Sequence, residues 1–117
     1  MTNEQVYAMP FAKVYYLLVN KATRKGRTEA EVQQILCWLT GCTQAQIAQA
    51  IEAGTPYGDF FRNAPHINPC CLLVKGSICG VRVENIEELP MRYIRVLDKL
   101  VDELAKGRPM EKILRQP

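Results

Sequence analysis

Apolar residues recur at spacings of three and four along most of this chain, a pattern that predicts amphipathic helices. The first predicted helix begins at Pro10, whose fixed φ suits a first helical position, and ends before Gly26. Asn85 and Glu88 suggest the cap of the last long helix, which Gly107 closes. The two apolar stripes consist of Phe11, Val14, Tyr15, Leu18 and Ala22, and of Tyr93, Ile94, Leu97, Leu100, Val101 and Leu104.

Start and stop signals predict further helices between and after these two. Two capping boxes, in which a threonine is followed three residues later by Glu or Gln, each open a helix. A Thr-Pro pair opens a short helix, and a proline opens another near the end of the chain. In chain order the signals are the box Thr28–Glu31 with Gly41, the box Thr43–Gln46 with Gly54, the pair Thr55 and Pro56, and Pro109.

Residues 65–86 form the least regular segment of the chain. Asn68 and Pro69 predict one or two further turns of helix. The stretch from Ile78 to Val83 is apolar and β-branched, but no second strand is evident as its partner, so we expect extended chain packed on the helices. Residues 1–117 are therefore predicted to form a single all-α domain, a compact bundle of about five or six helices with an irregular central segment over 65–86.

The charge is unevenly distributed, although the formal net charge is only +3. Residues 28–61 contain four acidic side chains and no basic ones, whereas residues 1–27 contain five basic side chains and one acidic one. A dedicated nucleic-acid binder usually carries a larger and more continuous basic excess. The basic stretch from Lys21 to Arg27 is typical of a solvated helix end, and a contact patch for an acidic partner is the alternative.

The location of the protein is predicted from signals that the sequence lacks. No apolar run approaches the roughly 18–20 residues that span a bilayer. The N-terminal residues contain Glu4 and no basic region of the kind that begins a signal peptide. We therefore expect a cytoplasmic protein without membrane contact.

The cysteines do not predict a disulfide framework, because their number is odd and no export signal is present. His66 with the cysteines at 70, 71 and 79 would supply four zinc ligands, but adjacent cysteines point in different directions. We expect no metal, no cofactor and no catalytic residue. The five cysteines are Cys37, Cys42, Cys70, Cys71 and Cys79.

Residues 29–53 permit a helix-turn-helix interpretation with Gly41 in the turn. Gln44, Gln46 and Gln49 are side chains that bond to base edges. This helix has no Lys or Arg to contact phosphate and it carries Glu52, so an ordinary helical hairpin is favoured and nucleic-acid binding is not expected.

The segment from Lys75 to Arg82 is the candidate ligand site. Its two glycines let the backbone approach a ligand, and exposed amide groups beside two cations would hold a small anion or a nucleotide. The spacing is not that of a P-loop. The alternative is that both glycines permit tight turns against the core. The candidate site residues are Lys75, Gly76, Ser77, Gly80 and Arg82.

Several segments together resemble one small bacterial family, domain of unknown function two thousand two hundred, over nearly the whole chain. The most specific of them runs from Lys75 to Glu84. The resemblance implies a bacterial, cytosolic, single-domain protein and transfers no site residue. The other segments are Trp38–Gly41, Phe60 and Phe61 with Ala64 and Pro65, Asn68 and Pro69, Leu97–Leu100 and Met110–Leu114.

Taken together, the sequence favours binding over catalysis, because one histidine and no recognisable catalytic constellation accompany a small helical domain. The leading hypothesis is a protein-interaction module whose partner is an unknown protein or a second copy of the chain. Anion or nucleotide binding at Lys75–Arg82 is the alternative, and helix-turn-helix DNA binding through residues 29–53 is a further one. The sequence does not specify the partner, the ligand, the oligomeric state or the pathway.

Overall fold

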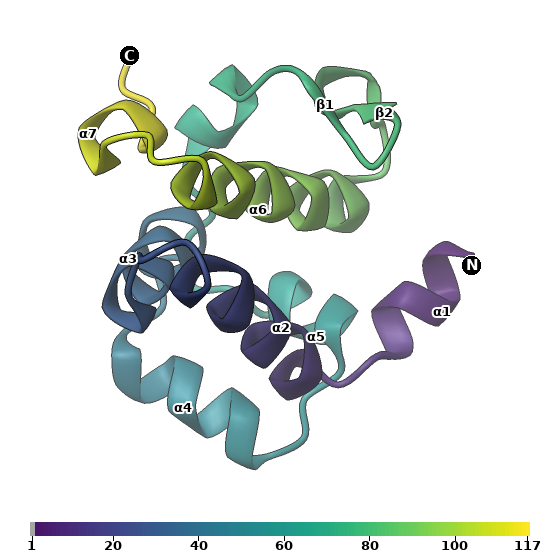
Figure 1. The fold of residues 1–117 in the computed structure, drawn as a ribbon. Helices are drawn as coiled ribbons and strands as arrows, with labels where there is room; N and C mark the ends of the chain where they lie inside the picture. The colour runs from purple at the N-terminus through teal and green to yellow at the C-terminus, as the bar shows by residue number, and fades with distance from the viewer. Residues whose placement is uncertain (1) are drawn as a thin grey trace.

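Helix α6, Leu89–Ala105, is the element around which the others pack in the computed structural model, which describes residues 2–117. On one side it contacts α2, α3 and α5, and on the other it contacts a small hairpin and α7 (Figure 1). The remaining bounds are α1 Asn3–Ala8, α2 Phe11–Thr23, α3 Glu29–Thr40, α4 Gln44–Glu52, α5 Tyr57–Arg62, the 3₁₀ helix η1 Pro69–Leu73, β1 Ser77–Ile78, β2 Val81–Arg82, the 3₁₀ helix η2 Val83–Asn85 and α7 Met110–Ile113.

The predicted all-α fold is confirmed, with seven α-helices within residues 2–117. One of them, α1, precedes the first helix that the sequence predicts. A third capping box opens it, because the Thr2 side chain accepts from the Gln5 amide and the Gln5 side chain accepts from the Thr2 amide. Pro10 lies just before α2, so the predicted start of that helix is correct to one residue.

Both predicted capping boxes are present, at Thr28 with Glu31 and at Thr43 with Gln46. Gly41 ends α3 in the left-handed conformation at φ 74°. Two other helix starts differ from the prediction. Pro56 precedes α5 and Glu88 precedes α6, and neither residue makes a side-chain capping hydrogen bond. Thr55 and Asn85 were wrongly predicted as cap residues, whereas Glu88, named together with Asn85, is the N-cap residue of α6.

The end of α3 is joined to the start of the irregular segment. The backbone amide of His66 donates to the Thr40 carbonyl and that of Asn68 donates to the Leu39 carbonyl, both at 3.0 Å. These bonds satisfy carbonyl groups that a helix end leaves open. A side chain at position 41 would place its Cβ 2.9 Å from the His66 carbonyl oxygen, so glycine is required for this close approach.

The expectation that Ile78–Val83 has no strand partner was wrong. Ser77 pairs with Arg82 and Ile78 pairs with Val81 in an antiparallel hairpin. The two turn residues, Cys79 and Gly80, both have positive φ, at 51° and 77°. This turn matches the natural twist of paired strands, so a strand and its partner fit into six residues.

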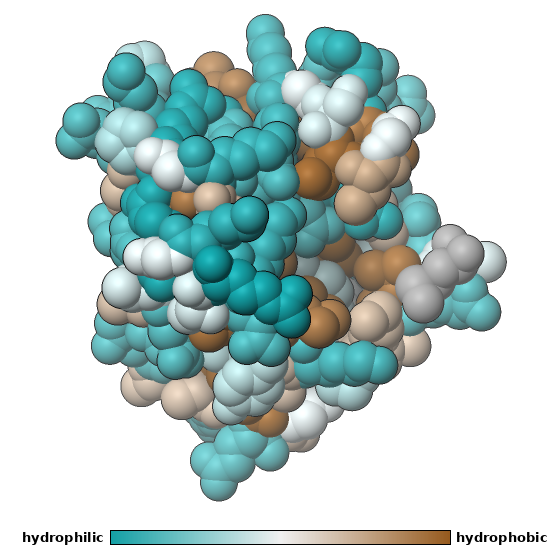
Figure 2. All heavy atoms as spheres, in the orientation of Figure 1, coloured by the Kyte–Doolittle hydropathy of each residue, from teal (hydrophilic) through white to brown (hydrophobic). Residues whose placement is uncertain are grey.

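The buried core is continuous from α1 to α7, and α6 contributes the largest share of it. Figure 2 shows that most of the facing surface is hydrophilic, with apolar side chains gathered from the hairpin to α1. Within residues 2–117 the helices are too short or too polar to cross a bilayer. The core residues on α6 are Met91, Ile94, Val96, Leu97, Leu100, Val101 and Leu104.

Candidate functional site

The predicted anion site lies on the hairpin and on the turn before it. Gly76 has a φ of 115°, and Gly80 occupies the turn between the strands. Both glycines thus adopt backbone conformations with positive φ that the turns require. Arg82 is paired with Ser77 across the strands. The structure therefore brings four of the five predicted residues together, with Lys75 exposed beside them.

The Glu84 carboxylate already contacts the groups that would receive an anion. Its Oε2 accepts from the Gly76 amide at 3.1 Å, and its Oε1 accepts from the Arg82 guanidinium at 3.0 Å. Backbone amides, of Glu84 itself and of Gly76, hold the pKa of the Glu84 carboxyl below its usual value, and Arg82 adds to the effect. An external anion would compete with this internal one, and anion binding here stays a prediction.

The cysteines and the histidine of the irregular segment occupy different environments. Cys71 is the buried residue of η1, whereas His66 and Cys79 are exposed. Burial raises the pKa of the Cys71 thiol, which makes it a poorer nucleophile and metal ligand. Among the described residues, no group of three or more His, Cys, Asp or Glu side chains is placed to hold a metal ion.

Two surface depressions lie beside helix α4, the second helix of the helix-turn-helix interpretation. Of its nine residues only Ile47 is buried. Gln46 has its carboxamide oxygen engaged by the Thr43 amide in the capping box. Recognition of DNA by this helix stays the less favoured interpretation of residues 29–53.

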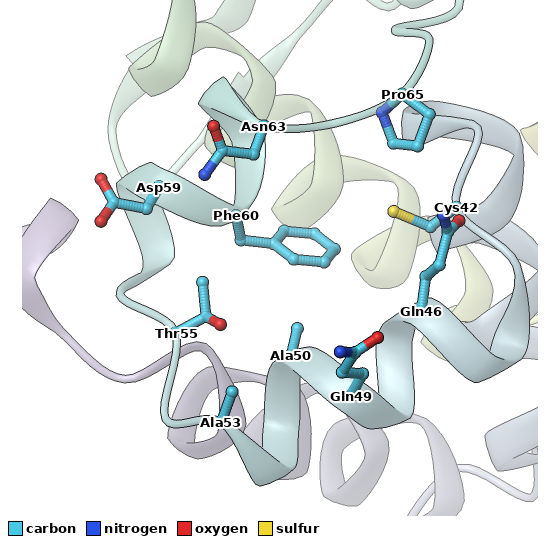
Figure 3. A pocket seen from close by; sticks show the side chains of 10 residues that line it. All are labelled: Cys42, Gln46, Gln49, Ala50, Ala53, Thr55, Asp59, Phe60, Asn63 and Pro65. Atoms are coloured by element: carbon cyan, nitrogen blue, oxygen red, sulfur yellow. The ribbon is translucent and has the colours of Figure 1, made fainter.

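The first depression, which we call the carboxamide pocket, lies between α4, α5 and the chain that follows α5, and has a volume of about 290 Å³. Figure 3 shows the Phe60 ring at its centre, with the carboxamides of Gln46, Gln49 and Asn63 around it. The Asp59 carboxylate points away from this ring and pairs with Arg62 at 3.2 Å. The remaining lining residues are Cys42, Ala50, Ala53, Thr55 and Pro65.

The second depression, which we call the acidic groove, lies between α2, α3 and α4 and has a volume of about 300 Å³. Tyr16, which is 54% exposed, is one of the residues that line it. Two carboxylates, Glu29 from α3 and Glu52 from α4, line the same groove. The other lining residues are Tyr15, Gln33, Ile47, Ala48 and Ile51.

Hydrogen bonds fix one of these carboxylates in place. The buried Tyr15 hydroxyl donates to Glu29 Oε2 at 2.6 Å and accepts from Gln33 Nε2 at 3.0 Å. Burial and then the bond to Glu29 raise the pKa of Tyr15 well above its usual value, so the hydroxyl keeps its proton and continues to donate. Glu29 is therefore held toward the groove before any ligand arrives.

Charge pairing distinguishes the groove from the rest of the acidic segment. Glu31 pairs with Arg27 at 2.6 Å, and Asp59 pairs with Arg62. The other two acidic residues of segment 28–61 are Glu29 and Glu52, and neither forms an ion pair within residues 2–117. The two acidic side chains of this segment that lack a cation are thus the two that line the groove.

Sequence reasoning considered the glutamines of α4 only for DNA base contacts, in an interpretation that it did not favour. It did not identify Tyr16, Glu29 or Glu52 as site residues. A signal for the groove was present, because segment 28–61 is acidic without a compensating base. Glu31 pairs with Arg27 four residues before it and Asp59 with Arg62 three residues after it, so these pairs follow from spacing along the chain. What the fold adds is that Glu29 and Glu52 line one groove.

Comparisons with known proteins agree on the family and assign no activity. The sequence matches, over residues 5–115, the family described as "Uncharacterized protein conserved in bacteria (DUF2200)". The crystal structure of the uncharacterized protein SP1917 is similar, with a TM-score of 0.91 and 42% sequence identity over 97% of this chain and 93% of that chain. A search among curated proteins finds no match.

Proposed function

Because the chain belongs to the bacterial family DUF2200, whose description names no activity, we propose a function from its own surface: it is a binding module that receives a basic side chain of a protein partner in the acidic groove. The observation that carries the proposal is the presence of two carboxylates without cations, Glu29 and Glu52, beside the exposed ring of Tyr16. The chain acts by binding, without catalysis.

The position of Glu52 supports a role outside the folding of the chain. Glu52 is the last residue of α4, where the negative end of the helix dipole disfavours a carboxylate. Glu29, by contrast, lies in the first turn of α3, where the dipole favours it. The charge of Glu52 therefore costs stability in the free protein, and an external cation would offset that cost.

The chemistry of the groove matches a lysine or arginine side chain. Carboxylates attract the cationic head, and the face of a tyrosine ring attracts a cation within about 6 Å of its centroid. The apolar side chains of Ile47 and Ile51 suit the methylene stem of the same residue. A volume of about 300 Å³ is at the lower limit for a small-molecule site and suits one side chain.

The proposal is tested with a fluorescein-labelled peptide that carries several arginines and lysines, by fluorescence anisotropy at low and at physiological salt. Glu29→Gln and Glu52→Gln are each expected to weaken binding by about fivefold, equivalent to roughly 1 kcal/mol. Tyr16→Ala is expected to weaken it and Tyr16→Phe to preserve it, because phenylalanine keeps the ring face.

Glu87→Gln is the matched control, because Glu87 is exposed, carries the same charge and lies outside the groove. Equal effects of Glu87→Gln and Glu52→Gln would show that only the net charge attracts the peptide, and would refute the groove. Unchanged affinity in both groove variants would refute it as well.

The same charge argument predicts a change in the free protein. Glu52→Gln is expected to raise the free energy of unfolding by about 0.3–1 kcal/mol, because it removes a negative charge from the C-terminal end of a helix. Urea denaturation at low salt measures the change. A decrease in stability would contradict the view that Glu52 is retained for binding.

The partner that supplies the basic side chain is a different protein or a second copy of this chain. Arg24 and Lys25 are exposed after α2 and form no ion pair within the described part of the chain, so a second copy carries suitable cations. Sedimentation equilibrium of the wild type and of the variant Arg24→Glu/Lys25→Glu distinguishes a second copy from a different protein as the partner. Self-association that this variant abolishes identifies a second copy as the partner.

A further inference from the structure

We propose that the carboxamide pocket is a second binding site, for a small uncharged ligand that carries a carboxamide or lactam edge next to an apolar ring. This site lies on the opposite side of α4 from the acidic groove and shares no lining residue with it. The proposal is therefore independent of the protein-binding function, and a negative result for one site leaves the other unaffected.

The pocket offers neutral hydrogen-bonding groups that the fold does not use. The carboxamides of Gln49 and Asn63 and the hydroxyl of Thr55 have no hydrogen-bond partner among residues 2–117. Gln46 is engaged only through its oxygen, which leaves the amide nitrogen available. A carboxamide has one acceptor and two donor hydrogens, so it pairs reciprocally with another amide edge.

The charges around the pocket argue against an ionic ligand. The lining contains no lysine or arginine to hold an anion. Its one carboxylate, Asp59, is paired with Arg62 and points away from the Phe60 ring (Figure 3). A charged ligand would thus lose water without gaining a counter-ion inside the pocket, a loss that an uncharged ligand avoids.

The apolar part of the lining indicates what the ligand carries next to its amide. Phe60 is held by the ring of Phe11, which stacks on it with ring centroids 3.9 Å apart and an angle of 9° between the planes. Ala50 on α4 and Ala53 at the C-cap of that helix present only methyl groups beside it. The Cys42 side chain, 9% exposed, directs its sulfur toward the Phe60 ring (Figure 3). An apolar ring bearing an amide fits these walls.

The test uses three probes that share a phenyl ring and differ in the charge and hydrogen-bonding groups of its planar substituent: benzamide, benzoate and benzamidine. Each is titrated into the ¹⁵N-labelled protein and followed by amide chemical shifts. Benzamide is expected to shift signals of Gln49, Asn63 and their neighbours, and benzoate to leave them unchanged. Benzamidine is cationic and is expected to shift signals around Tyr16 and Glu52 instead.

Variants locate the binding. Gln49→Ala and Asn63→Ala are each expected to weaken benzamide binding by about fivefold, the effect of one lost hydrogen bond. Gln44→Ala is the matched control, because Gln44 lies on the same helix, is exposed and does not line the pocket. Ala50→Leu fills the pocket and is expected to abolish binding while the spectrum stays dispersed.

The proposal is refuted if benzamide shifts none of the pocket signals up to its solubility limit, or shifts them no more than benzoate does. It is also refuted if Gln44→Ala weakens binding as much as Gln49→Ala. Loss of the benzamidine response at Tyr16 and Glu52 alone would count against the acidic groove and leave the carboxamide pocket intact.

Discussion

Single residues join the N-terminal helix to the rest of the molecule. The Tyr7 hydroxyl donates a hydrogen bond to the Glu88 carboxylate at the start of α6, and Asn3 donates to the same oxygen at 2.8 Å. Beside this contact Gly58 lets α1 approach α5, because a Cβ there would lie 2.6 Å from Tyr7 Cβ. Burial and the bond to Glu88 raise the pKa of Tyr7 from 10.0 to about 12.

This pKa predicts how stability changes at alkaline pH. The unfolded chain loses the Tyr7 proton near pH 10, whereas the folded chain keeps it up to about pH 12. The folded state binds more protons in this interval, so the contribution of Tyr7 is complete below pH 10 and is lost as the pH rises toward 12. Tyr7→Phe is expected to reduce the slope of the free energy of unfolding against pH between these values.

Urea denaturation at pH 7, 9, 10 and 11 measures this slope. At pH 7 the variant is also expected to lose about 1.5–3 kcal/mol, the value of a hydrogen bond to a charged group. Tyr16→Phe is the control, because its ring is 54% exposed. An alkaline slope that is the same in the wild type and in Tyr7→Phe would contradict the assignment.

A comparison of alanine substitutions at two glycines distinguishes the free-energy cost of backbone strain from that of steric crowding. Gly26 and Gly41 have similar φ values, 80° and 74°, but only Gly41 faces another backbone, that of His66. Gly26→Ala is expected to cost about 1–2 kcal/mol through strain alone. Gly41→Ala is expected to cost about 1–3 kcal/mol more, because overpacking adds to the strain. Chemical denaturation of both variants checks this, and equal losses would disprove the role of His66.

At the scale of elements, α4 differs from α6 in how it is anchored. The former buries one residue, Ile47, and has a depression on each side, whereas the latter buries eight residues. Helices with few buried contacts open locally at a free energy below that of global unfolding. Both proposed sites thus lie on an element that a ligand can adjust at little cost.

Hydrogen exchange checks this difference between the helices. The amides in the central turns of α4 are expected to exchange faster than those of α6, whose slowest amides should report global unfolding. Ligand at either site is expected to slow exchange in α4. Equal protection of α4 and α6 in the free protein would show that α4 is anchored as firmly as the core.

Elements also differ in how well the sequence predicted them. The capping boxes at Thr28 and Thr43 are signals within four residues, and both are present. The hairpin was missed because Cys79 and Gly80 lack the usual Asn-Gly signature of its turn, and because each strand has only two residues. Helix α1 was missed because six residues with one buried side chain, Tyr7, leave no visible stripe.

At the scale of the molecule, the predicted site and the proposed sites lie in different places. The hairpin lies on one side of α6 and α4 lies on the other (Figure 1). The Glu84 contact belongs to the hairpin side, and both depressions are lined by residues of α4. The sequence predicted an anion site at the hairpin, because its glycines lie between two cations. In the folded chain the Glu84 carboxylate contacts both the Gly76 amide and Arg82.

The longer helices and their buried faces follow from the sequence, because apolar spacing and capping act over a few neighbouring residues. The sequence also determined that segment 28–61 is acidic. Tertiary packing brings the two unpaired carboxylates into one groove, because Glu29 and Glu52 come from different helices. The carboxamide pocket has the same origin: Gln49 and Asn63 become neighbours only when α4 and α5 pack around Phe60.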